Sequence, residues 1–389
     1  MLAVLAPGQG SQTPGMLSPW LDLPGVEQQI AEFSDLAGLD LRRLGTTADA
    51  AEIKDTAVTQ PLIVALGLVA AGQLNLQGDG VVVAGHSAGE LTAAAVSGAI
   101  GAADAVAFAA RRGAEMAAAC ALTPTGMSAL LGGDPDEVVA AIAAGGLTAA
   151  NRNGAGQVVA AGSLDALAEL AKNPPNGARV RPLPVAGAFH THYMGPAEEA
   201  LADFSQSLNA RNPEQMLLSN ADGASMMTGH DVLGRLVRQV TRPVRWDLCL
   251  DTLRHLKVTV AIELPPAGAL TGIAKRELPG VQLLALKSPD DLAAARAAVG
   301  SVSHDGQGEH TVDFQIVVSP AKGIFHPAPD AVEGELVRRG ARIGTIATNR
   351  DEHAVVAGSA GVLAEWLKHD GDIVGAGLPV ARVQTGSED

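Results

Sequence analysis

The pentapeptide GHSAG (85–89) holds a serine between two glycines, one residue after the β-branched run 81–83. A serine hydroxyl is a weak nucleophile at neutral pH and needs both a neighbouring base and an exposed position. Gly-x-Ser-x-Gly between a strand and a helix provides that position, because the glycines permit a sharp turn that lifts Oγ above the sheet edge. The N-terminus of the following helix also faces any oxyanion formed there. The pattern predicts that Ser87 is a nucleophile, and the alternative is a structural serine in a turn.

The base for such a serine is often a histidine, and the chain has ten. His190 lies in the segment PVAGAFHTHYM (184–194), where an apolar run ends in small residues and a polar turn follows. His192 lies two residues further on and is the local competitor. The spacing favours this segment as the source of the base, without choosing between the two histidines.

The elements that must position Ser87 are those of a parallel α/β sheet. A buried strand enters the Gly-rich loop 8–15, and a second buried strand ends at the serine turn. Strands that are separated by helices favour parallel pairing. We expect a parallel-sheet, α/β-hydrolase-like core formed by residues 1–125 and 186–298. Its first predicted elements are strands at 2–7 and 81–85 and helices at 56–75, with Pro61 near the first turn, 88–100 and 102–121.

Residues 126–185 show a different order of predicted strands and helices from the core. Their pattern predicts the order β-α-β-β-α-β, which is the split βαβ arrangement of a ferredoxin-like subdomain. We therefore expect an insertion between the two core segments. The predicted elements are strands at 127–133, 147–154, 157–163 and 178–185 and helices at 134–146 and 163–173.

The C-terminal part begins after a polar segment, 299–313, that carries Gly and Ser and lacks periodicity, as a linker does. A weak internal repeat follows, in which residues 334–346 resemble residues 364–377. Two copies of short strands and tight turns predict a small pseudo-symmetric all-β barrel at residues 314–384.

Composition excludes several classes of function. The chain has 389 residues, 47% of them apolar, and a net charge of −15, so it is globular and a poor general binder of nucleic acid or anionic membrane. Its two cysteines form no CxxC pair, which argues against a zinc or redox motif, and no metal is expected. The N-terminus lacks a basic signal segment, and the most apolar stretch, 61–72, is shorter than the ~20 residues that span a bilayer. A cytoplasmic protein is expected.

Several ordered segments give the chain a resemblance to a known family. Over about residues 1–290 it resembles the malonyl-CoA:acyl carrier protein transacylases of fatty acid and polyketide synthesis. The segments are PGQGSQ (7–12), TQP (59–61), GHSAGE (85–90), RRGAEM (111–116), ANRNGAGQVVAAG (150–162), GAFHTHYM (187–194), RPVRW (242–246) and ELPPAGALTGIAKR (263–276).

The resemblance implies transfer of malonyl from malonyl-CoA to the phosphopantetheine thiol of an acyl carrier protein through an O-malonyl-Ser87 ester. His190 would take the serine proton and return it to the leaving thiol. Backbone N–H groups of Gln9 and Ala88 would hold the oxyanion. A backbone carbonyl within 239–246 would orient the histidine in place of an Asp. No cofactor beyond the two substrates is implied.

The same resemblance assigns the acyl pocket. Arg112, in the RG pair at 112–113, would bind the free malonyl carboxylate bidentately, although composition alone favours a surface arginine beside Arg111. Gln60 would line the same pocket, and Phe189 would limit the space beside the malonyl α-carbon. Asn153, with Asn151, would contact the pantetheine arm.

Serine hydrolases are the rival class, because they share the GxSxG pattern. In α/β-hydrolases an Asp precedes a His near the end of the catalytic domain, whereas here about 100 family-like residues follow His190. A patatin-like Ser–Asp hydrolase is the closer rival, because NADGA (220–224) contains Asp-Gly-Ala. Such enzymes usually have a GGG oxyanion loop where this chain has PGQGSQ. A thiol-acceptor assay with and without carrier protein separates the classes.

Residues 314–384 resemble a biotinyl/lipoyl-type carrier domain. Arg350 stands where the modified lysine is expected, and Lys322 and Lys368 fall elsewhere. We therefore expect neither biotin nor lipoate. By analogy, this domain would recruit acetyl-CoA carboxylase or another synthase component.

Overall fold

The computed structural model describes residues 1–76, 80–304, 313–348 and 351–385. The chain divides into two compact units. The first comprises Met1–Leu253 and Val258–Val299, and the second comprises Arg254–Lys257 with the residues from Gly300 onward.

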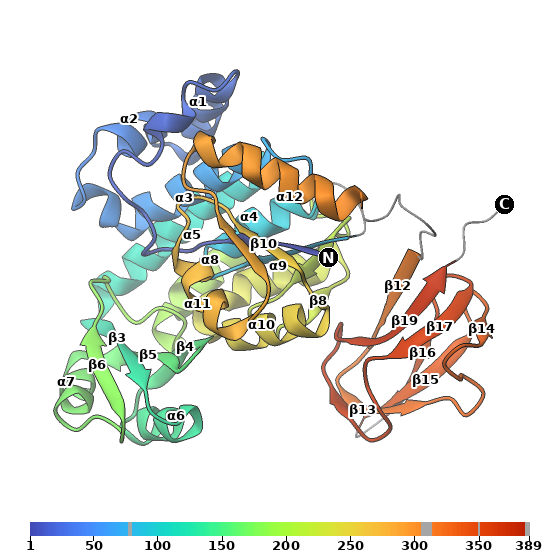
Figure 1. Ribbon diagram of the computed structural model, residues 1–389. Helices are drawn as coiled ribbons and strands as arrows, with labels where there is room; N and C mark the ends of the chain where they lie inside the picture. The colour runs from blue at the N-terminus through green and yellow to red at the C-terminus, as the bar shows by residue number, and fades with distance from the viewer. Residues whose placement is uncertain (77–79, 305–312, 349–350, 386–389) are drawn as a thin grey trace. The chain divides into compact units, whose positions relative to one another are not determined.

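A six-stranded sheet forms the centre of the first unit, with helices packed around it (Figure 1). Every residue of its strands β1 and β2 is buried, as expected of strands covered on both faces. Neighbouring strands are parallel except β8, which pairs antiparallel with β7 at one edge. The strands, in spatial order, are β11 (Gln282–Ala285), β10 (Val260–Glu263), β1 (Leu2–Ala6), β2 (Val81–Gly85), β7 (Met216–Leu218) and β8 (Ser225–Met226).

The helices around this sheet include two that bring distant parts of the chain together. Helix α3 packs against α5, and a Cβ at Gly113 of α5 would lie 2.6 Å from the carbonyl oxygen of Thr56. The helices are α1 (Val26–Ala37), α2 (Leu41–Thr46), α3 (Thr56–Ala71), α4 (Gly89–Val96), α5 (Ala102–Leu122), α8 (Gly195–Ser205), α9 (Gly229–Arg238), α10 (Trp246–His255), α11 (Ala269–Glu277) and α12 (Leu292–His304), with short 3₁₀ turns η1 (Ser18–Trp20), η2 (Glu52–Lys54), η3 (His192–Met194), η4 (Gln239–Thr241) and η5 (Pro289–Asp291).

Two expectations about these helices need correction. Pro61 was expected near the first turn of its helix, but it is the sixth residue of α3 and lies inside it. The side chain of Asp55 caps this helix by accepting from Ala57 N at 2.8 Å, which fixes its start before the proline. Helix α12 continues to His304, so the first residues of the expected linker are helical. The helix contains a glycine, Gly300, in its interior, at a cost of about 1 kcal/mol relative to alanine. Residues 305–312 of that linker lie outside the described residues.

Residues 125–182 form a second sheet with two helices, in the predicted β-α-β-β-α-β order. The sheet order is β6-β3-β5-β4-β9. Its last strand was not predicted: β9 follows η4 and pairs parallel with β4, Asn151 opposite Val244. The elements are β3 (Thr125–Gly132), α6 (Pro135–Ala144), β4 (Thr148–Gly154), β5 (Gln157–Ser163), α7 (Leu164–Lys172), β6 (Ala178–Pro182) and β9 (Val244–Arg245).

The second unit contains two four-stranded antiparallel sheets around one apolar core, with Phe325 and Leu363 fully buried. Arg350 lies outside the described residues, in the connection between β15 and β16. The sheets have the orders β12-β19-β17-β14 and β16-β15-β13-β18, with the strands β12 (Asp313–Val318), β13 (Gly323–Pro327), β14 (Leu336–Val337), β15 (Arg342–Ala347), β16 (Glu352–Val356), β17 (Gly361–Trp366), β18 (Ile373–Val374) and β19 (Pro379–Thr385).

Among the described helices of both units, none combines the length and the apolar character that crossing a bilayer requires.

Candidate active site

Ser87 lies in the turn between β2, which ends at Gly85, and α4, which begins at Gly89. Its backbone is left-handed, with φ of +52°, which is a strained conformation for a residue other than glycine. The flanking glycines are required by close packing. A Cβ at Gly85 would lie 2.1 Å from the backbone of Gly89, and a Cβ at Gly89 would lie 2.1 Å from the carbonyl oxygen of Ala6. This is the sharp strand-to-helix turn that the GxSxG pattern predicts.

His190, and not His192, is the histidine at this serine. Ser87 Oγ and His190 Nε2 are 2.8 Å apart, and His190 Nδ1 lies 2.8 Å from the carbonyl oxygen of Gln239. Because a carbonyl oxygen can only accept, Nδ1 carries the proton and Nε2 presents its lone pair to the serine hydroxyl. His192 is exposed and stacks on Tyr193, with ring centroids 4.2 Å apart.

The His190 imidazole is held neutral. Burial, reinforced by the positive charge of Arg112, lowers the pKa of His190 to about 3. Both causes disfavour the imidazolium form, so the ring can accept a proton from Ser87 at neutral pH without being charged beforehand.

Arg112 is buried at this site although its neighbour Arg111 is at the surface. The Arg112 residue is 1% exposed. Its Nη1 donates to Gln60 Oε1 at 2.6 Å, and its Nη2 lies 2.7 Å from Gln239 Oε1 and 3.3 Å from Ser87 Oγ. The Arg111 side chain is 48% exposed and pairs with Glu115 at 2.9 Å. Burial lowers the pKa of Arg112 to about 10, so it remains a cation at neutral pH. Helices α3 and α5, packed together, therefore bring Gln60 into contact with Arg112, whose guanidinium reaches the serine.

The loop after β1 brings Gln9 to the serine turn. A Cβ at Gly8 would lie 2.4 Å from the carbonyl oxygen of His86, so the loop and the turn are in direct contact. The Gln9 side chain donates to Thr56 Oγ1 at 3.2 Å. Within the part of the chain that the structure describes, the backbone N–H groups of Gln9 and Ala88 donate to no other group. Two backbone donors thus remain open around this turn.

Phe189 and Asn153 complete the set expected from the sequence. Phe189 is 6% exposed and directly precedes His190. Asn153, at the end of β4, contacts the turn through His86, whose Nε2 lies 2.9 Å from Asn153 Oδ1. Asn151 is also buried, and its Oδ1 has no hydrogen-bond partner among the residues that the structure describes. A buried acceptor that is left unpaired costs about 1–3 kcal/mol, so Asn151 could accept from a bound group.

Sequence reasoning missed three polar side chains beneath Ser87. Gln239 Nε2 donates to the Ser87 carbonyl oxygen at 3.1 Å, and Asn220 Oδ1 accepts from the Ser87 N–H at 2.8 Å. Glu90 accepts from the Asn220 N–H and from Gln239 Nε2. The only signal for Gln239 was the expected histidine-orienting carbonyl within 239–246. Glu90 could have been noticed as an acid in an otherwise apolar helix.

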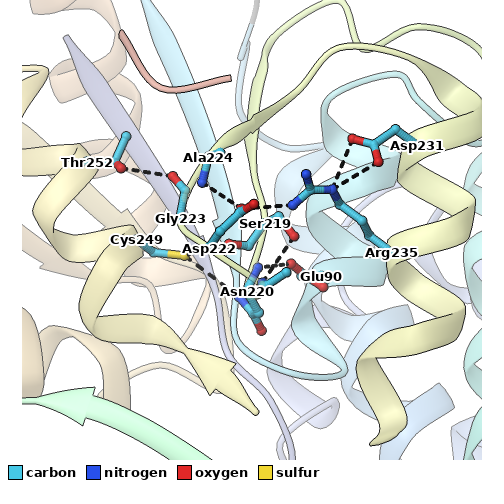
Figure 2. Close-up of polar contacts among 11 residues, drawn as sticks. Glu90, Ser219, Asn220, Asp222, Gly223, Ala224, Asp231, Arg235, Cys249 and Thr252 are labelled. Carbon is cyan, nitrogen blue, oxygen red and sulfur yellow. Dashed lines mark hydrogen bonds and ion pairs between the residues drawn. The ribbon is translucent and has the colours of Figure 1, made fainter. Parts of the chain in front are cut away.

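The Ser–Asp alternative is not supported by the position of Asp222. Its Oδ1 accepts from Ala224 N at 3.0 Å and from Arg235 Nη1 at 2.8 Å, and Arg235 also pairs with Asp231 (Figure 2). Asp222 is therefore occupied by an ion pair, whereas the Ser87 hydroxyl contacts His190 and Arg112.

The fold and this site are those of an acyltransferase. The family model described as the acyl transferase domain matches residues 4–320, and the chain belongs to that family.

Among the relatives, the malonyl CoA-acyl carrier protein transacylase of Mycobacterium tuberculosis strain H37Rv is 58% identical over 296 residues, which cover 75% of this chain and 98% of the relative. The transacylase of the same name from Escherichia coli strain K12 is 33% identical over 302 residues, 75% of this chain and 98% of the relative. The crystal structure of MCAT from Mycobacterium tuberculosis has a TM-score of 0.74 and 57% identity, covering 76% of this chain and 99% of that one. The malonyl-transacylase solved in complex with a type II PKS acyl-carrier protein has a TM-score of 0.71 and 28% identity, over 76% and 99%.

Proposed function

We propose that this protein transfers malonyl from malonyl-CoA to the phosphopantetheine thiol of an acyl carrier protein, through an O-malonyl-Ser87 ester, for fatty acid or polyketide synthesis. The observation that carries the proposal is the buried cation of Arg112, 3.3 Å from Ser87 Oγ. A serine–histidine pair alone fits many acyl substrates. A buried guanidinium beside the nucleophile selects an acyl group that ends in a carboxylate.

The first half-reaction loads the serine. Ser87 Oγ attacks the thioester carbonyl carbon of malonyl-CoA while its proton passes to His190 Nε2, 2.8 Å away. The open N–H groups of Gln9 and Ala88 hold the oxyanion. The intermediate collapses by breaking the C–S bond, and the leaving thiolate of coenzyme A takes the proton from His190. The Gln239 carbonyl keeps the imidazole aligned throughout, because it binds Nδ1–H.

The second half-reaction runs the same steps in reverse with a new thiol. The carrier's phosphopantetheine thiol gives its proton to His190 Nε2, and the thiolate sulfur attacks the ester carbon. The C–O bond to Ser87 then breaks, and Oγ recovers the proton from His190. Asn153, with Asn151, contacts the pantetheine arm that both substrates share.

The acyl pocket is formed by Arg112, Gln60 and Phe189. Arg112 binds the free malonyl carboxylate, and Gln60 holds the guanidinium in place through the 2.6 Å contact with Nη1. Phe189, beside the base, limits the space at the α-carbon. A filled pocket with a fixed carboxylate also excludes the water that would hydrolyse the ester.

We further propose that residues 126–185 are a ferredoxin-like subdomain inserted into an α/β-hydrolase-like core of residues 1–125 and 186–298. The order β6-β3-β5-β4 of four antiparallel-paired strands, with two helices between them in sequence, supports this assignment.

Residues 314–384 form in this proposal a biotinyl/lipoyl-like domain that carries no attached group and recruits a partner such as acetyl-CoA carboxylase or another synthase component. Lys322 lies between β12 and β13, and Lys368 lies between β17 and β18. Neither is in the β15–β16 connection, where the modified lysine of such a domain is expected. An intact mass that contains a biotin or lipoate increment would contradict this assignment.

Incubation with malonyl-CoA alone tests the central proposal. Ser87 should gain the mass of one malonyl group, which carrier protein then removes. The Ser87→Ala variant should gain nothing, and labelling of that variant would show that the nucleophile lies elsewhere. The control is Ser11→Ala, because Ser11 has a similar hydroxyl in the neighbouring loop and bonds only to Gly8 O among the described residues.

A further inference from the structure

Glu90 is a buried acid for which the transfer mechanism has no use. It is the second residue of α4, directly after the serine turn, and it is 1% exposed. Burying a carboxylate costs several kcal/mol unless hydrogen bonds compensate. The hydrogen-bond partners of Glu90 must therefore compensate for its burial.

Each oxygen of Glu90 accepts from a different donor beneath the serine. Oε1 accepts from the backbone N–H of Asn220, as Figure 2 shows, and Oε2 accepts from the side-chain Nε2 of Gln239. Asn220 in turn binds the Ser87 N–H through Oδ1 and the Gly85 carbonyl through Nδ2. Glu90 thus connects the serine turn to Gln239.

The two ends of the Gln239 amide are not interchangeable. Its Oε1 faces Arg112 Nη2 at 2.7 Å, and a guanidinium can only donate. Its Nε2 donates to the Ser87 carbonyl oxygen at 3.1 Å, to Asn220 Oδ1 at 3.3 Å and to Glu90 Oε2. The amide therefore keeps its oxygen towards Arg112, and Glu90 holds the nitrogen on the other side.

Packing does not supply the same restraint. Glu90 and Gln239 both line a cavity of about 270 Å³, together with Ser219, Arg235 and neighbouring residues. The oxygen and the nitrogen of an amide are nearly the same size, so packing distinguishes them poorly. Hydrogen bonds must then fix the orientation of the Gln239 amide, and those from Nε2 go to Glu90, the Ser87 carbonyl and Asn220 Oδ1.

We infer that Glu90 is a positioning residue that fixes the amide of Gln239 and thereby aligns Arg112 for the carboxylate of the acyl group. The inference rests on the proposed function, because it explains how the selectivity of that site is maintained. It also assigns Gln239 two roles, since its backbone carbonyl orients His190 while its side chain orients Arg112.

The Glu90→Gln variant isolates this role with little change in shape. A glutamine offers one acceptor oxygen to two donors that need one each. The Asn220 N–H belongs to the backbone and cannot rotate, so the conflict falls on Gln239. Whether that amide turns over or moves away, Arg112 loses its acceptor. The preference for malonyl over acetyl, as the ratio of kcat/KM values, should fall roughly tenfold or more, which is the worth of one hydrogen bond to a charged group.

The experiment measures that ratio in the intact protein, the Glu90→Gln variant and a Ser97→Ala control. Ser97 caps the C-terminus of the same helix and is fully buried. Among the described residues its Oγ bonds to Ala94 O alone, so its removal tests a generic loss of a buried hydrogen bond. The control should keep the ratio. Equal falls in the malonyl and acetyl rates of Glu90→Gln would show a merely structural role and overturn the inference.

A Gln239→Met variant tests the same chain of contacts with Glu90 intact. It should lower the ratio to a similar extent, and adding Glu90→Gln to it should produce little further change, because both act through one amide. An unchanged ratio in Gln239→Met, or fully additive effects, would refute the inference even if Glu90→Gln does not fold. Failure of the unaltered protein to prefer malonyl would instead overturn the proposed function itself.

Discussion

Replacing Arg112 by methionine removes the charge from the acyl pocket while filling much of its volume. Arg112 lies within hydrogen-bonding distance of Gln60 Oε1, Gln239 Oε1 and Ser87 Oγ, so contacts within the protein orient its guanidinium. A malonyl carboxylate that enters finds a fixed partner and requires little rearrangement. The variant should therefore lose the carboxylate-specific part of binding and keep the serine–histidine chemistry.

The expected fall in kcat/KM for malonyl-CoA follows from the burial of the contact between Arg112 and the malonyl carboxylate. Arg112 is 1% exposed, so its bonds to a carboxylate would form away from water. Removing one partner of a buried ion pair costs about 3–5 kcal/mol, and each 1.36 kcal/mol is a factor of ten in rate. We expect kcat/KM for malonyl-CoA to fall roughly 10²–10⁴-fold, and we expect that for acetyl-CoA to stay or rise.

The assay is transfer to a holo carrier protein from each thioester, with Arg111→Met as the matched control. Arg111 is the adjacent residue, but it is exposed and paired with Glu115, so its replacement should change neither rate by more than a few-fold. The reasoning is wrong if Arg112→Met keeps its preference for malonyl, or if both thioesters lose activity equally while the protein stays folded.

Three further predictions concern the wall of the pocket, the buried base and the second unit. Phe189→Ser should improve turnover of methylmalonyl-CoA relative to malonyl-CoA by roughly 10–200-fold, and an unchanged ratio would exclude Phe189 as the wall beside the α-carbon. The pKa of His190 is about 3 in the folded protein and near 6.5 when unfolded, so the unfolded chain binds the extra proton. From pH 6.5 to 5 the free energy of unfolding should fall by about 1.6 kcal/mol more than in His190→Gln. An equal fall in the two proteins, measured by urea unfolding, would contradict this. A chain that ends at Gly300 should transfer malonyl within a few-fold of the full rate, and a large loss would mean that the second unit contributes to turnover.

Local patterns in the sequence were sufficient to predict the serine turn and most of the helices and strands. GHSAG after a β-branched run required a strand, a sharp turn and a helix, and the structure has all three because two glycines permit the close packing. The six elements of residues 125–182 were also predictable, because each is a short segment with its own periodicity. The choice of His190 over His192 was not, since it depends on which side chain reaches a residue about 100 positions away.

The polar residues beneath Ser87 show where local patterns fail. Gln239 and Asn220 are ordinary polar residues in their own segments, and only the fold brings them 152 and 133 positions back to Ser87. The strand β9 is two residues long and exists because β4 lies beside it. The continuation of α12 into the expected linker reflects helix propensity that Gly and Ser did not outweigh.

The hydrogen-bond partners of Arg112 among the described residues are two amides and a hydroxyl, none of them a carboxylate. A carboxylate in direct contact with Arg112 must therefore arrive with the substrate. Loading the serine with malonyl brings that carboxylate and keeps it in place as a covalent ester. The loaded form is therefore the one in which the Arg112 guanidinium has a carboxylate partner. Where malonyl-CoA is plentiful, the protein should rest in that form as a reservoir of activated acyl units, and the arrival of empty carriers should set the pace of synthesis.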